Sequence, residues 1–105
     1  MPASFTKVAR QGELAPGEMK LVALPGERIL LVNLQGEYLA VGERCPHADG
    51  PLAEGWLEGE VLECPWHGGQ FNVRTGAVLS PPATQGLPRY QVRLDGDEIL
   101  VGPPA

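Results

Sequence analysis

Cys45-Pro46-His47, followed after sixteen residues by Cys64-Pro65-Trp66-His67, is the stretch that most constrains the fold of this chain. The two segments hold both cysteines and both histidines of its 105 residues. Thiolate and imidazole are the side chains that bind softer transition metals, so the four residues predict one shared site. Each cysteine is followed by a proline, which fixes the backbone angle φ and offers no N–H. Glycines at positions 50, 68 and 69 let the backbone pass close to a bound group.

Three chemical interpretations of these residues stay open at this point. A two-iron, two-sulfur cluster can be held by two thiolates on one iron and two imidazoles on the other. A single tetrahedral zinc ion could use the same four ligands. A Cys45–Cys64 disulfide could form in an oxidising compartment, but it leaves the parallel placement of the histidines unexplained. The pattern favours the [2Fe–2S] cluster, with Cys45, His47, Cys64 and His67 as its ligands.

Length, composition and charge limit the class of protein. A chain of 105 residues predicts one domain, and 43% hydrophobic with 20% charged residues indicates a globular one. The net charge of −5 argues against nucleic-acid binding and favours partners with a basic surface. No segment has the apolar length of a membrane span, and Met1 to Gly17 lacks the apolar region of a secretory signal. We therefore expect a cytoplasmic protein that does not bind membranes.

The rest of the chain is typical of about ten short antiparallel strands joined by tight turns. The run Arg28 to Leu34 is almost continuously apolar, which indicates a strand buried on both faces. Asp95-Gly96 predicts a hairpin turn, residues 102–105 read as a frayed tail, and no window predicts a helix. The predicted strands are 5–9, 19–24, 28–34, 38–41, a hairpin over 56–63, 70–73, 77–79, 90–94 and 98–101.

The predicted fold class is all-β, with stacked antiparallel sheets and the two ligand loops inserted as a subdomain. We expect a single domain over residues 1–105. Its cluster-binding loops are expected at about 43–55 and 64–70, and a proline-containing loop at about 80–86.

These residues resemble those of the Rieske-type ferredoxins, over nearly the whole chain. Cys45-Pro46-His47 with Pro51-Leu52 and Glu54-Gly55 resembles the first ligand loop of that family. Residues 64–71, followed by Arg74-Thr75-Gly76, resemble the second, and Ser80-Pro81-Pro82 is similar to the proline loop that leans over the cluster. The resemblance implies the Rieske [2Fe–2S] (ISP-like) fold and one Rieske-type cluster.

The nearest resemblance is to the soluble ferredoxin components of ring-hydroxylating oxygenase systems. It implies an electron-transfer protein rather than an enzyme: a monomer that carries single electrons from a flavin-dependent reductase to a terminal oxygenase through transient contacts. A Rieske-like small subunit of an NADH nitrite reductase or another oxidoreductase is the alternative. A zinc-stabilised structural module is the third hypothesis.

Two positions after the second histidine depart from the membrane-bound respiratory Rieske proteins. Those proteins place a serine and a tyrosine there, whose hydroxyls donate to cluster and cysteine sulfurs, whereas this chain has Gly69 and Phe71. Fewer donors stabilise the reduced cluster less. The expected potential is therefore near the low end of the Rieske range, about −150 mV. Asp49 adds a negative charge that acts in the same direction.

The sequence also predicts the surroundings of several other side chains. Trp56 and Phe71 are expected in the core, while Trp66 either packs on the sheet or joins a docking surface. Pro46, Leu52 and Pro82 are expected to form an apolar rim around the histidines. The acidic residues Glu54, Glu58, Glu60 and Glu63 are expected on a solvated face of the 56–63 hairpin.

Overall fold

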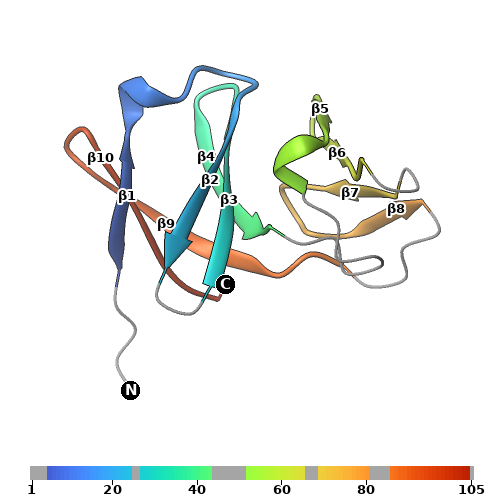
Figure 1. Ribbon diagram of the computed structural model, residues 1–105. Coiled ribbons are helices and arrows are strands. Elements are labelled where there is room, and N and C mark those ends of the chain that lie inside the picture. The colour runs from blue at the N-terminus through green and yellow to red at the C-terminus, as the bar shows by residue number, and fades with distance from the viewer. Residues whose placement is uncertain (1–4, 25–26, 44–51, 66–68, 81–85, 105) are drawn as a thin grey trace.

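The computed structural model describes residues 5–24, 27–43, 52–65, 69–80 and 86–104. These residues form two antiparallel sheets that lie side by side (Figure 1), so the all-β prediction is confirmed. The larger sheet has the order β1-β10-β9-β4-β3-β2, and the smaller has the order β5-β6-β7-β8. The strands of the larger sheet are β1 (Thr6–Arg10), β2 (Met19–Leu24), β3 (Glu27–Leu34), β4 (Glu37–Gly42), β9 (Arg89–Asp95) and β10 (Glu98–Pro104). Those of the smaller sheet are β5 (Trp56–Glu58), β6 (Val61–Glu63), β7 (Gln70–Asn72) and β8 (Val78–Ser80).

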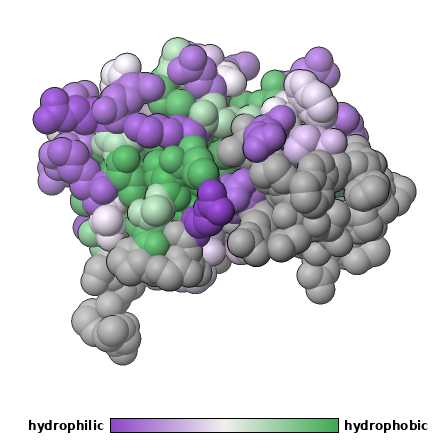
Figure 2. Space-filling view, in the orientation of Figure 1, coloured by the Kyte–Doolittle hydropathy of each residue, from purple (hydrophilic) through white to green (hydrophobic). Residues whose placement is uncertain are grey.

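The larger sheet curls until its two edge strands, β1 and β2, approach each other. All six of its strands turn apolar side chains into the space enclosed. We call this set the barrel core; its buried members are Ala9, Leu14, Val22, Ile29, Leu31, Ala40, Ile99 and Val101. In the view of Figure 2, hydrophobic residues also reach the surface mainly over this sheet.

A second core lies where the larger sheet meets the smaller one. We call it the inter-sheet core; its buried members are Leu30, Val32, Leu34, Val41, Leu52, Leu62, Cys64, Phe71, Val73 and Leu87. Strand β3 contributes to both cores, because successive side chains of a strand point to opposite faces. Ile29 and Leu31 enter the barrel core, whereas Leu30 and Val32 enter the inter-sheet core. The prediction of a strand buried on both faces is confirmed.

One expectation about a chain segment was wrong. Residues 102–104 are not a frayed tail, because they continue β10, where Pro104 pairs with Tyr90 of β9. The described ranges contain two short 3-10 helices, η1 (Gln11–Glu13) and η2 (Leu52–Glu54), and no α-helix, in agreement with the sequence prediction. Within the described ranges, no helix is long and apolar enough to cross a membrane.

An ion-pair brace joins the two sheets. Arg74, in the turn after β7, contacts Glu37 at the start of β4, and its Nε donates to Glu60 Oε2 at 3.3 Å. The hydrogen bond to Glu37 raises the pKa of Arg74 above its usual value. Asn72 orients the turn, since its Oδ1 accepts from the backbone N–H of Arg74 at 2.8 Å and of Thr75 at 3.2 Å. All these side chains are partly or largely exposed, so the brace aligns the sheets more than it stabilises them.

Candidate metal centre

Cys64 is the predicted ligand that the structure describes; Cys45, His47 and His67 lie outside the described residues. It directly follows β6, and its side chain is fully buried in the inter-sheet core. The alternation of β6 explains this position: Leu62 points inward, and Cys64 is the next residue on the same face. The thiol is therefore held by packing against the core that joins the two sheets.

Backbone hydrogen bonds fix the bases of both predicted ligand loops. Leu52 N–H donates to Glu43 O at 2.9 Å, which closes the loop that carries Cys45 and His47. Cys64 N–H donates to Gly69 O at 2.8 Å, which closes the loop that carries His67. Each pair of loop ends is therefore held by main-chain atoms, whatever side chains the loop bears.

The end of the first loop touches the start of the second. Gly55 N–H donates to Leu52 O at 3.0 Å, and a Cβ placed on Gly55 would lie 2.1 Å from Glu63 O. Only a residue without a Cβ fits there. Gly55 thus lets η2 press against the residue that precedes Cys64, which brings the frames of the two loops together.

The base of the predicted proline loop is held against the turn after β7. Leu87 N–H donates to Gly76 O at 2.8 Å, and Leu87 is buried in the inter-sheet core. Gly76 has a φ of +81°, and an added Cβ would meet Leu87 O at 2.6 Å. The remaining proline-loop residues, 81–85, lie outside the described ranges.

The comparisons with known proteins agree with this arrangement. The chain matches the Rieske [2Fe-2S] domain over residues 4–91. It belongs to the Rieske [2Fe–2S] family.

This Rieske protein is similar to several ferredoxins of nearly its own length. It is 44% identical over 98 residues to the ferredoxin component of biphenyl 2,3-dioxygenase from Rhodococcus jostii, covering 93% of this chain and 92% of that one. The ferredoxin of carbazole 1,9a-dioxygenase from Nocardioides aromaticivorans superposes with a TM-score of 0.90 at 34% identity, covering 95% and 98% of the two chains. A ferredoxin solved in complex with the oxygenase of carbazole 1,9a-dioxygenase superposes with a TM-score of 0.88 at 34% identity, covering 92% and 91%. The chain is an electron carrier with a Rieske-type [2Fe–2S] cluster, not an enzyme.

The described residues fit such a cluster. A thiol at a buried loop base, with main-chain atoms closing the loop around it, suits a fixed soft ligand better than a reactive surface cysteine. Elsewhere in the described ranges, no group of three His, Cys, Asp or Glu side chains is placed to hold a metal ion. No second site in those ranges competes with the one that includes Cys64.

Some expectations about the side chains around the metal centre are confirmed and others are wrong. Phe71 is fully buried in the inter-sheet core, as expected. Leu52 is also fully buried there, so it is part of the core and not of an exposed apolar rim. Trp56 is 60% exposed, so its assignment to the core was wrong. The rim residues Pro46 and Pro82, as well as Asp49 and Trp66, lie outside the described residues.

The acidic residues of the hairpin face solvent, as predicted. Glu54, Glu58 and Glu60 are exposed, and Glu63 is half-buried, with its Oε1 accepting from Gln70 Nε2 at 3.1 Å. Two structural features around the metal centre were not predicted from the sequence: the close approach at Gly55 and the ion-pair brace at Arg74. The isolated arginine after a long acidic stretch is a signal that could have identified the brace.

A substitution at Gly55 tests whether the contact between the two loop bases positions Cys64. We expect Gly55→Ala to push the Glu63 carbonyl away and to displace Cys64, because the added Cβ has no room. The variant should unfold at a lower temperature and contain less iron and sulfide per chain than the parent protein. Calorimetry and iron and acid-labile sulfide assays measure both.

Gly12→Ala is the matched control, because an added Cβ there meets nothing within 4 Å. It should leave iron content and stability unchanged. Equal iron content in Gly55→Ala and the parent protein would show that the contact does not position Cys64.

Proposed function

We propose that this Rieske protein is the ferredoxin component of an aromatic-ring dioxygenase system. In this role it receives single electrons from a flavin-dependent reductase and passes them to a terminal oxygenase. The observation that carries the proposal is the pairing of a buried, loop-closing Cys64 with near full-length similarity to ferredoxin components of such systems. The complex of a related ferredoxin with its oxygenase supports a terminal oxygenase as the electron acceptor.

We further propose that Cys45 and Cys64 ligate one iron and His47 and His67 the other. When bound, the cluster takes up and returns one electron. Cys64 supplies thiolate charge from within an apolar core, and the packing of Leu62 and Phe71 excludes water from that side. Two neutral imidazoles in place of two thiolates make the site less negative, which eases its reduction relative to a four-cysteine cluster.

The reductase, the monomeric state and the cytoplasmic location belong to the same proposal. The net charge of −5 supports brief, salt-sensitive contacts with basic partner surfaces. The carrier should be a monomer of 11.2 kDa by light scattering. Elution as part of a larger enzyme would favour the alternative, a permanent oxidoreductase subunit.

Electron paramagnetic resonance (EPR) tests the ligand assignment. We expect a rhombic signal only after dithionite reduction, with an average g below that of four-cysteine clusters. Cys64→Ala should abolish the signal and the bound iron, because the cluster loses a thiolate. Val73→Ala, a truncation in the same core, should retain both. A colourless parent protein with one zinc ion per chain would overturn the proposal.

A redox titration tests the effect of the missing hydroxyl donors. We expect a midpoint near the low end of the Rieske range, about −150 mV, because Gly69 and Phe71 have no side-chain donor. Phe71→Tyr should raise the midpoint by adding a hydroxyl, whereas Phe71→Leu, which adds none, should not raise it. A parent midpoint well above zero would contradict this reasoning.

A further inference from the structure

Among the described residues, Trp56 is an exposed aromatic side chain that neither the core nor the metal centre explains. It lies on β5, the edge strand of the smaller sheet, and 60% of it is exposed. Its indole N–H has no acceptor among the described residues. Large exposed aromatics are enriched at protein interfaces, where a rigid apolar ring carries a polar edge.

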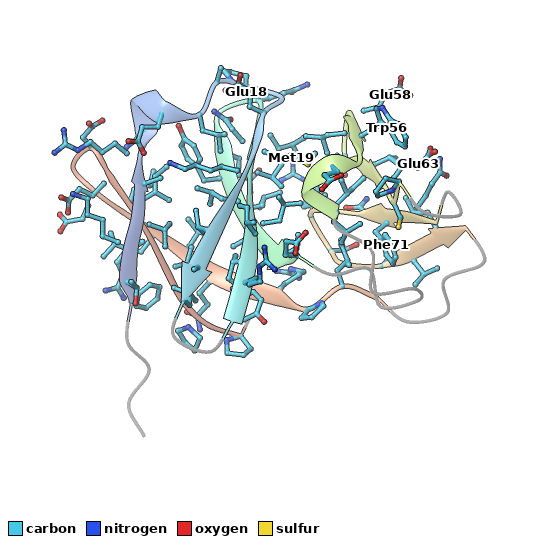
Figure 3. The ribbon with its side chains drawn as sticks, viewed as in Figure 1. Glu18, Met19, Trp56, Glu58, Glu63 and Phe71 are labelled. Carbon is cyan, nitrogen blue, oxygen red and sulfur yellow. The ribbon has the colours of Figure 1, made fainter. Side chains whose placement is uncertain are left out.

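The register of the hairpin places two carboxylates beside this ring. Glu58 is two residues along β5 and therefore on the same face, and Glu63 of β6 pairs directly with Trp56. Leu57 and Leu62 pair on the opposite face, toward the inter-sheet core. Figure 3 shows Trp56, Glu58 and Glu63 at the outer margin of the smaller sheet. We call these three residues the Trp56 face.

The hydrogen bonds within the sheet leave this face negative. Glu63 is oriented by Gln70 Nε2, a neutral donor. Glu58 has no cation partner among the described residues. The first basic residue after the hairpin along the chain, Arg74, is engaged by Glu37 and Glu60. No positive side chain of the described residues therefore neutralises the two carboxylates.

The charge distribution of the whole chain points to the same region. Residues 45–73 contain five acidic residues and no lysine or arginine. The rest of the chain has eight acidic and eight basic residues, so the whole net charge of −5 belongs to this stretch. The Trp56 face lies within it. A field of one sign around an exposed ring selects a partner of the opposite sign.

We propose that the Trp56 face is a docking surface for a redox protein that presents clustered arginine or lysine side chains. The carboxylates of Glu58 and Glu63 pair with the cations, and the indole stacks against a guanidinium or covers an ammonium. Because Trp56 pairs with the residue before Cys64, a partner here sits against the strand that leads directly into a proposed ligand. The inference rests on the proposed electron-carrier function and adds the location and chemistry of a partner contact.

Electron transfer to mitochondrial cytochrome c, a lysine-rich redox protein, provides the test. The dithionite-reduced protein, freed of dithionite, gives one electron to each ferric haem, and stopped-flow absorbance yields the second-order rate constant. At low ionic strength, the double variant Glu58→Gln/Glu63→Gln should lower the rate constant about fivefold to tenfold. Trp56→Ala should lower it about threefold. High salt should remove most of the effect of the double variant.

Matched controls separate this face from net charge and from exposed apolar area in general. Asp95→Asn/Asp97→Asn removes the same charge at the β9–β10 turn, and Leu94→Ala truncates a side chain that is 49% exposed. Both controls should stay within about twofold of the parent rate constant. Losses in the double control as large as those in Glu58→Gln/Glu63→Gln, or no loss in either face variant, would overturn the proposal.

The EPR signal and midpoint of each variant are recorded first. A parent protein that shows no reducible cluster would contradict the proposed function, and the docking proposal would fall with it. A normal cluster with rate constants insensitive to the Trp56 face would overturn the docking proposal alone.

Discussion

The burial of strand β3 on both faces is the constraint on which the rest of the structure depends. A strand has only two faces, and β3 gives one to the barrel core and the other to the inter-sheet core. The barrel closes around Ile29 and Leu31, while the smaller sheet packs onto Leu30 and Val32. Cys64 belongs to the second core. The position of this proposed ligand therefore depends on the same apolar contacts that join the two sheets.

In the loops around the metal centre, backbone atoms hold the loop bases together and side chains are proposed as ligands. Main-chain hydrogen bonds close the loop bases at Leu52 and Cys64, and the absence of a Cβ at Gly55 lets the bases meet. Loop side chains are then not needed to hold the frame and can serve as ligands. The Arg74 brace lies on the outside of the same junction, between Glu37 of the larger sheet and Glu60 of the smaller.

Much of the fold could be predicted because its signals are local. The apolar run of β3, the Asp95-Gly96 turn and the paired Cys/His motifs each carry their own evidence, and the strand predictions followed from them. Trp56 was wrongly assigned to the core. The alternation of side chains in β5 and β6 predicts its position better. Because Leu57 and Leu62 point inward, Trp56 must share the outer face with glutamates. The burial of Leu52 was not predicted, because a lone apolar residue in a Pro- and Gly-rich loop is not part of a periodic hydrophobic pattern.

The measurement that tests the central claim most directly compares Leu30→Ala with Leu31→Ala. Both side chains are fully buried on β3, but Leu30 enters the core that contains Cys64 and Leu31 enters the barrel core. Each variant should lose about 2–5 kcal/mol of unfolding free energy. Only Leu30→Ala should change the g values and midpoint of the reduced cluster. Equal changes in both variants, or a change in Leu31→Ala alone, would contradict the dependence of the metal centre on the inter-sheet core.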